Sequence, residues 1–205
     1  MYLWSLLVNM DEKVAKVKLE MFLQEMKFLE ADLEYHTIVL QSMQGDFLKH
    51  YDERTKRMGV VEKIREASKK NKQQPPPPPG SKPRPSKKSK EVYKKIATIA
   101  HPDKLLHLSD EEREEMQKKF MTASDAISNN MMLTLYQIAQ DLGVEMPAPT
   151  LEDLQTFEEE LNSLKVKIDD MENNWIWHYA NAKTDDHKEE IMKRYVYSVL
   201  TNLPK

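Results

Sequence analysis

The chain has 205 residues, a formal net charge of -3 and no cysteine. The absence of cysteine excludes disulfides, thiolate metal sites and cysteine nucleophiles, and the slightly negative charge argues against a protein that binds nucleic acid over its whole surface. Glycine is scarce, with 4 residues, charged residues make up 32% of the chain, and no run alternates as a strand would. We therefore predict an all-α protein of one or two domains.

The first segment, residues 1–61, is predicted to be a coiled-coil helix. Its opening eight residues are apolar but too few to span a membrane, and they lack the basic start of a signal peptide. We expect these residues to pack on another part of the protein. We also expect the protein to be cytoplasmic and not to associate with a membrane. Asn9 is a candidate N-cap, with Glu12 three residues on. Gly59 is expected to break or kink the helix.

Two apolar stripes follow that helix. The first alternates strides of three and four, which is the spacing of a coiled-coil seam, and consists of Leu19, Phe22, Met26, Leu29, Leu33, His36, Leu40, Met43 and Phe47. His36 would be a polar residue that fixes the register of this seam. A second stripe widens the apolar face and indicates more than one partner helix: Val14, Val17, Met21, Phe28, Tyr35 and Ile38.

Residues 62–89 are predicted to be a linker. Lysines and arginines lead into five consecutive prolines, Pro75 to Pro79, which favour a stiff polyproline II spacer. A ligand for a proline-binding domain and a nucleic-acid tether are the alternatives. Because no aromatic residue lies between Tyr51 and Tyr93, stacking on bases has no support, and a solvated spacer is preferred.

A basic helix and a turn open the segment 90–146. The apolar residues of this helix recur at spacings of three and four, so they share one face: Val92, Tyr93, Ile96, Ile99 and Ala100. Pro102 disfavours helix at His101 and has no amide proton to donate, so the helix should end there. Lys88, Lys94 and Lys95 fall largely off the apolar face.

A second helix should begin after a short loop. Ser109 and Glu112 form a candidate capping box. One long helix is then predicted to reach about Leu142, where Gly143 closes it, with Met116, Phe120, Ala123, Ile127, Met131 (or Met132) and Leu135 on its apolar face. Two such helices joined by a short loop favour an antiparallel hairpin.

Residues 88–135 resemble a J-domain, the co-chaperone module that stimulates ATP hydrolysis by DnaK-type chaperones. Family members have a tyrosine eight residues before the histidine, then an aliphatic-alanine pair, then His-Pro-Asp. Tyr93, Ile96-Ala97 and His101-Pro102-Asp103 match this pattern, and Lys104 gives the common His-Pro-Asp-Lys form. The family's later phenylalanine, aliphatic and alanine positions are occupied by Phe120, Ala123 and Ala126.

Two features depart from the family pattern. The family's first short helix, with its Tyr-x-x-Leu-Gly signature, is missing before the basic helix, where the proline-rich linker stands instead. Tyr136 and Leu142-Gly143-Val144 appear after the third helix, an arrangement that would cover the same core from the other side. Smaller residues than usual stand at Ala100 and Ala123.

The C-terminal segment 147–205 is predicted to be helical. Thr150 is a candidate cap with Asp153 three residues on, and a second heptad series follows: Leu154, Phe157, Leu161, Leu164, Ile168, Met171 and Trp175. Glu158, Glu159 and Glu160 are placed on its outside. We expect this series to pack antiparallel on the Leu19–Phe47 stripe. Self-association through either coiled coil is the open alternative.

The sequence shows no glycine-rich phosphate loop, serine elbow or paired-histidine metal motif. We therefore expect that the protein is not an enzyme and that it binds no cofactor or metal. The resemblance implies a co-chaperone that binds a DnaK-type ATPase through His101, Pro102, Asp103, Lys104, Lys94, Lys95 and Lys88, with the coiled coils binding a client or an assembly. Nucleic acid is not an expected partner. A viral origin would suit such a protein, and its location would then be the host cytoplasm. In the alternative, a coiled-coil scaffold or adaptor, His-Pro-Asp is only a turn.

Overall fold

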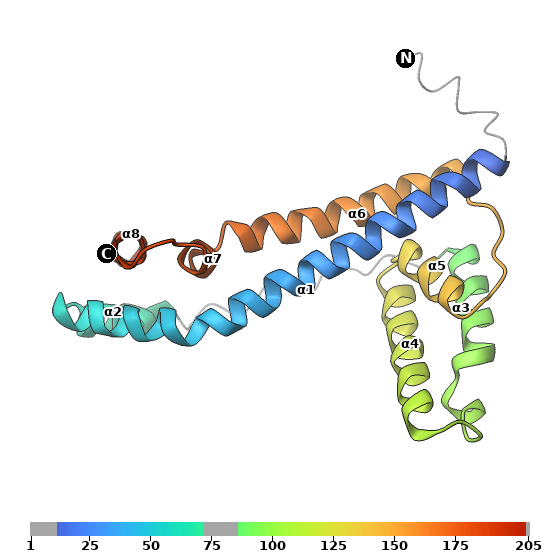
Figure 1. The fold of residues 1–205 in the computed structure, drawn as a ribbon, viewed down its shortest axis with the longest axis horizontal. Helices are drawn as coiled ribbons and strands as arrows, with labels where there is room; N and C mark the ends of the chain where they lie inside the picture. Colours follow the sequence, from blue (N-terminus) through green and yellow to red (C-terminus); the bar gives the residue numbers. More distant parts are fainter. Residues whose placement is uncertain (1–11, 72–85, 204–205) are drawn as a thin grey trace, which may run out of the picture. The chain divides into compact units, whose positions relative to one another are not determined.

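The computed structural model describes residues 12–71 and 86–203, with side chains described to residue 67 in the first range. The regular structure in these ranges is all helical, without a strand (Figure 1), so the all-α prediction is confirmed. In chain order the elements are α1 (Glu12–Arg57), α2 (Val61–Asn71), α3 (Lys87–Ala100), the 3-10 turn η1 (Pro102–Lys104), α4 (Asp110–Ser128), α5 (Met132–Asp141), α6 (Leu151–Glu172), α7 (Trp175–Ala180) and α8 (Asp185–Thr201).

Contacts divide the chain into two compact units. Unit 1 contains the described residues of Met1–Leu29 and Gly80–Ser163, and unit 2 contains those of Glu30–Pro79 and Leu164–Lys205. Helices α1 and α6 each contribute their first part to unit 1 and their second part to unit 2. Each unit is therefore built from two stretches that are far apart in the sequence.

Helices α3, α4 and α5 pack on one another in all three pairs to form the centre of unit 1. The chain descends through α3, turns, and returns along α4 in the opposite direction (Figure 1). Ile96, Ala100 and Ala123 are completely buried between these helices. Small residues at the contact let the helix backbones approach closely. Ile99, which the sequence places on the buried face, is 40% exposed instead.

The single long helix predicted from Ser109 to Leu142 is wrong, because the chain breaks it into α4 and α5. Asn129 ends α4, and Asn130 adopts a positive φ of 58°. Asparagine tolerates this left-handed conformation better than most residues do. Gly143, with a φ of 67°, closes the structure after α5 as predicted.

Helix α5 packs on both α3 and α4, and a side chain of α6 holds its N-terminus. Met131 at its N-cap makes no side-chain capping bond. The carboxylate of Glu160 accepts the backbone N–H groups of Leu133 at 2.9 Å and Thr134 at 3.0 Å instead. Such a carboxylate at a helix N-terminus satisfies otherwise unpaired donors and favours the helix dipole. Placing Glu160 on the solvated outside of its helix was therefore wrong.

Unit 2 has an aromatic core where α1, α7 and α8 meet. Phe47, Tyr179, Ile191, Met192 and Val196 are buried together. The Phe47 ring meets Tyr179 edge-on with 5.4 Å between ring centroids. Trp175, the last residue of the second heptad series, also packs against this cluster.

Helices α1 and α6 pair in the same direction, so the predicted antiparallel pairing is wrong. Phe22 meets Phe157 in unit 1, with 6.3 Å between centroids, and His36 meets Glu172 in unit 2 at 3.2 Å. Positions in both helices thus increase together. The chain entering α6 is held beside the early turns of α1, where Lys27 pairs with Asp141 at 3.3 Å, so α6 has to start at that end.

Gly59 ends the first helix as predicted, with a φ of 65°. The chain then forms α2, a helix where the sequence analysis placed the first part of the linker. Ser86 and Lys87, at the linker's other end, cap and begin α3. The Asn9 cap, the apolar opening residues and the proline run lie outside the described residues.

None of the helices in the described ranges is long and apolar enough to cross a membrane.

Candidate functional site

The His-Pro-Asp sequence forms the turn between α3 and α4. Helix α3 stops at Ala100 because His101 takes an extended conformation, with φ -64° and ψ 134°, ahead of Pro102. Pro102 then opens the single 3-10 turn η1, a position at which its missing N–H costs nothing. The prediction that the helix ends at His101 is confirmed.

His101 is held at the surface with its ring against the hairpin. Its imidazole meets the Phe120 ring nearly edge-on, at 5.2 Å and 75°. Its Nδ1 accepts the backbone N–H of Asp103 at 3.4 Å and lies 3.5 Å from the Asp103 carboxylate. The His101 side chain is 44% exposed and that of Asp103 88% exposed. Both side chains can therefore reach a partner while the ring stays oriented.

The loop after the turn is fixed by contacts on both sides. Leu105 is buried, with 1% exposed. Arg113 of α4 donates to the carbonyls of Leu105 at 3.4 Å and Leu108 at 3.1 Å. The capping box of Ser109 and Glu112 is present in both directions, as predicted. Arg113 was not singled out from the sequence, because its bonds to these two backbone carbonyls leave no sequence signal.

The aromatic layer beneath the turn joins the two helices. Tyr93 lies against Phe120, with ring centroids 6.1 Å apart and tilted by 32°. Phe120 thus contacts both Tyr93 and His101. Tyr93 and His101 are therefore connected through Phe120, which orients the turn.

The predicted basic residues separate into two groups. Lys94 and Lys104 are exposed. Lys95 is also exposed and donates to the Glu145 carbonyl at 3.0 Å. Long ammonium side chains of this kind attract acidic surfaces at a distance and at little cost in desolvation.

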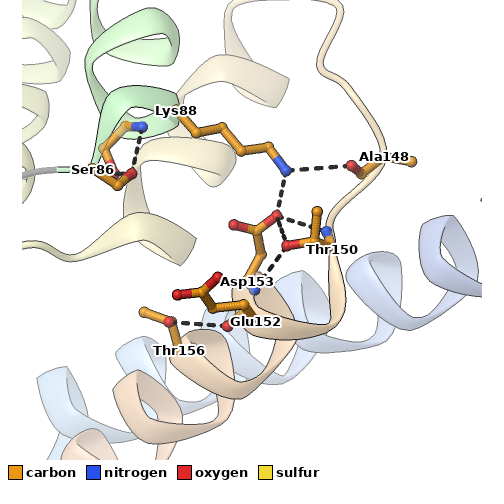
Figure 2. Close-up of polar contacts among 8 residues, drawn as sticks. Ser86, Lys88, Ala148, Thr150, Glu152, Asp153 and Thr156 are labelled. Atoms are coloured by element: carbon orange, nitrogen blue, oxygen red, sulfur yellow. Dashed lines mark hydrogen bonds and ion pairs between the residues drawn. The ribbon is translucent and has the colours of Figure 1, made fainter. Parts of the chain in front are cut away.

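Lys88 has a different position, because its ammonium is tied into unit 1. It pairs with the Asp153 carboxylate and donates to the Ala148 carbonyl at 3.4 Å (Figure 2). Asp153 also accepts the N–H of Thr150 at 2.6 Å and its hydroxyl at 2.8 Å, which bears out the predicted cap. Burial would raise the pKa of the Asp153 carboxyl, but the bonds from Lys88 and Thr150 outweigh it and lower that pKa below its ordinary value.

The polar groups at the α3–α4 turn favour binding over chemistry. The His101 imidazole, the Asp103 carboxylate and the Lys104 ammonium stand at the turn of the hairpin, where they can make directional hydrogen bonds and ion pairs. Lys94 and Lys95 lie further back along α3. Within the described ranges, no group of three or more histidine, aspartate or glutamate residues is placed to hold a metal ion.

No family model matches the chain, and searches of curated proteins and of solved structures find no match either.

Proposed function

We propose that the chain is a J-domain-like co-chaperone that stimulates the ATPase of a DnaK-type chaperone through His101, Pro102 and Asp103. The observation that carries this proposal is the position of these residues: an exposed turn between two packed helices, with His101 oriented by Phe120. The imidazole also caps the turn, and the side chains of His101 and Asp103 keep enough exposed surface to contact a partner.

Helix α5 supplies what the J-domain resemblance lacks. The family's first helix normally covers the hairpin, and here α5 packs on both α3 and α4. Leu133, Leu135 and Tyr136 of α5 are completely buried. The family's first helix precedes the hairpin in the sequence, whereas α5 follows it. In this proposal α5 covers the hairpin in place of the missing helix, so the hairpin keeps a closed core.

The mechanism is regulatory. Lys94, Lys95 and Lys104 attract an acidic face of the chaperone ATPase domain, and this attraction speeds encounter at low ionic strength. The His-Pro-Asp turn then favours the hydrolysis-competent state by binding it more tightly than the resting state. Lys88 acts within the protein, because its ammonium holds Asp153. ATP belongs to the partner.

Single-turnover ATP hydrolysis by a DnaK-type chaperone of the native host tests this proposal. The wild-type chain should accelerate hydrolysis, and His101→Gln and Asp103→Asn should abolish the acceleration with helix content unchanged. His107→Gln is the matched control, since His107 is exposed in the same loop, and it should stimulate as the wild type does.

A second J-domain protein known to stimulate the same chaperone confirms that the partner is competent. If that protein stimulates and the wild-type chain does not, the co-chaperone proposal is wrong. Stimulation that survives in both His101→Gln and Asp103→Asn would also reject it.

A coiled-coil scaffold or adaptor is the second candidate. The observation that favours it is the row of exposed apolar side chains on α1, such as Met21 at 64% and Phe28 at 69%. In this case the turn has no partner, and the helices alone assemble with other proteins. Loss of assembly on changing Met21 and Phe28, without any ATPase stimulation by the wild type, would select this candidate.

A further inference from the structure

Helix α1 carries two apolar stripes. Among the described residues the first stripe is largely buried, and the second is exposed apart from an edge-on contact of the Tyr35 ring with Trp177 at 6.1 Å. Of the first stripe, Met26 and Phe47 are almost completely buried, with 1% and 2% exposed. The second stripe is exposed along its whole length, with exposed fractions between 52% and 69% for Val14, Val17, Met21, Phe28, Tyr35 and Ile38. We call these six residues the outer stripe.

The outer stripe has the repeat of a coiled-coil seam. Its members follow alternating strides of three and four from Val14 to Ile38, and Gln24 and Ala31 occupy the two remaining seam positions. A helix that presents such a repeat over more than three heptads matches a partner with the same repeat and length. The chain itself provides one such partner, namely α1 of a second copy.

We propose that two copies associate through the outer stripes of their α1 helices, side by side and antiparallel. An antiparallel pairing centred near Met26 places every seam residue opposite another seam residue. The facing pairs, one residue from each copy, are Val14 with Ile38, Val17 with Tyr35, Met21 with Ala31, and Gln24 with Phe28.

The side-chain volumes select this direction. In the antiparallel register the large Phe28 faces Gln24, and the long Met21 faces the small Ala31, so the layers have similar volumes. A parallel pairing would place Phe28 on Phe28 in one layer and Ala31 on Ala31 in the next. Such uneven layers create both crowding and voids, and each of them destabilises a helix interface.

The area is sufficient for a dimer. An aromatic side chain can bury about 150–250 Å², so Phe28 and Tyr35, which are both more than half exposed, offer roughly 100 Å² each or more. If each of the six side chains contributes a similar area, the stripe offers on the order of 600 Å² of exposed apolar surface. Two copies would then bury about 1,200 Å² in total, which is the lower end of the range for stable interfaces.

Sedimentation velocity of the full chain across a concentration series tests the association. The wild type should move from monomer to dimer, and the double variant Met21→Glu with Phe28→Glu should remain a monomer, with dimer affinity at least 100-fold weaker. Tyr197→Glu is the matched control because Tyr197 is 68% exposed on α8, away from the stripe. A monomeric wild type at all concentrations would overturn the proposal, as would a dimer that survives the double variant.

Cysteine cross-linking tests the direction, and the absence of natural cysteine makes it unambiguous. In the antiparallel register Val17→Cys of one copy faces Tyr35→Cys of the other. In a parallel pair these positions lie about 27 Å apart along the axis, too far for a disulfide. A mixture of the two single variants should therefore cross-link, and Val17→Cys alone should not. Efficient cross-linking of Val17→Cys to itself would overturn the antiparallel register.

Discussion

The cores of the two units are built on different principles. In unit 1 the buried contacts between α3, α4 and α5 are made largely by small and aliphatic residues, among them Ala100, Ala123 and Ala139, each completely buried. In unit 2 the core is aromatic, and ionic groups lie beside it: His50 contacts Glu189 at 2.6 Å, and Arg54 pairs with the same carboxylate. Unit 1 also buries the rings of Tyr136 and Phe157 and contains the Lys88–Asp153 ion pair. The difference therefore lies in the helix contacts, because small residues are frequent between α3, α4 and α5, whereas aromatic rings dominate the core of unit 2.

One histidine from each unit illustrates the difference. His101 in unit 1 is 44% exposed at a turn, and only a ring edge and a weak hydrogen bond orient it. His36 in unit 2 is 3% exposed and has acceptors at both ring nitrogens: the Asp32 carbonyl at 2.8 Å and the Glu172 carboxylate at 3.2 Å. The first is available to a partner, and the second is bound within its own unit.

Truncating the core of unit 1 should have the largest effect. Ile96→Ala removes a side chain that is completely buried between helices, and we expect it to lower the free energy of unfolding by about 2–5 kcal/mol. Ile99→Ala, three residues later and 40% exposed, should cost less than about 1 kcal/mol. Urea unfolding followed by circular dichroism measures both values. Equal costs would mean that α3 does not bury the face described.

Removing the Lys88–Asp153 ion pair of unit 1 should have the next largest effect. Lys88→Met leaves the Asp153 carboxylate, which is 11% exposed, without its ammonium partner, and a buried charge left alone is costly. We expect a loss of about 1–3 kcal/mol, against almost none for Lys87→Met at an exposed position. The loss should be greatest near neutral pH and shrink in acid, because protonation removes the unpaired charge of Asp153.

Alkaline pH should weaken unit 2 through His36. Burial would lower the pKa of this imidazole, but the bonds to Asp32 and Glu172 raise it above its ordinary value. A raised pKa in the folded state means that the stabilisation is fully present below the ordinary imidazole pKa and is lost as pH rises through the folded value.

The measurement is the melting temperature between pH 6 and pH 9, with fluorescence of Trp177, which stacks on His36 at 4.1 Å, as a local signal. The wild type should melt a few degrees lower at the alkaline end. His36→Gln should flatten this part of the pH dependence. A slope that persists in His36→Gln would assign it to another group.

The smallest effect should come from the break between α4 and α5. Asn130 has a φ of 58°, which glycine adopts without strain, although glycine also gains entropy in the unfolded chain. The relief of backbone strain and the entropic cost oppose each other, so Asn130→Gly should change the free energy of unfolding by no more than about 0.5 kcal/mol. Asn129→Gly, at a φ of -106°, has the entropic cost and also loses the hydrogen bond from Asn129 Nδ2 to the Asp125 carbonyl at 2.9 Å, so it should be the less stable variant. The reverse order would contradict the assigned turn.

Local features of this chain were readable from its sequence, and contacts between distant segments were not. Pro102 and Gly59 end helices by steric rules that act within one turn, and Ser109 with Glu112 forms its capping box over three residues. The break at Asn130 was missed because asparagine is a weaker signal than glycine or proline.

Long-range partners have no local signature. Lys88 and Asp153 are separated by 65 positions. The direction of α6 along α1 depends on the point at which the intervening helices return the chain to α1. The candidate site divides in the same way. The motif at His101 was visible in the sequence, whereas its support by Arg113 and the engagement of Lys88 required three-dimensional contacts.

The capping of α5 by Glu160 has a consequence for synthesis on the ribosome. The N-terminus of α5 lacks a side-chain cap of its own, and its backbone donors are satisfied by a carboxylate 26 and 27 residues further along the chain. The nascent hairpin of α3 and α4 therefore emerges before the residue that completes its cover is available. Until Glu160 leaves the exit tunnel, the apolar face of that hairpin is open to chaperones that bind nascent chains.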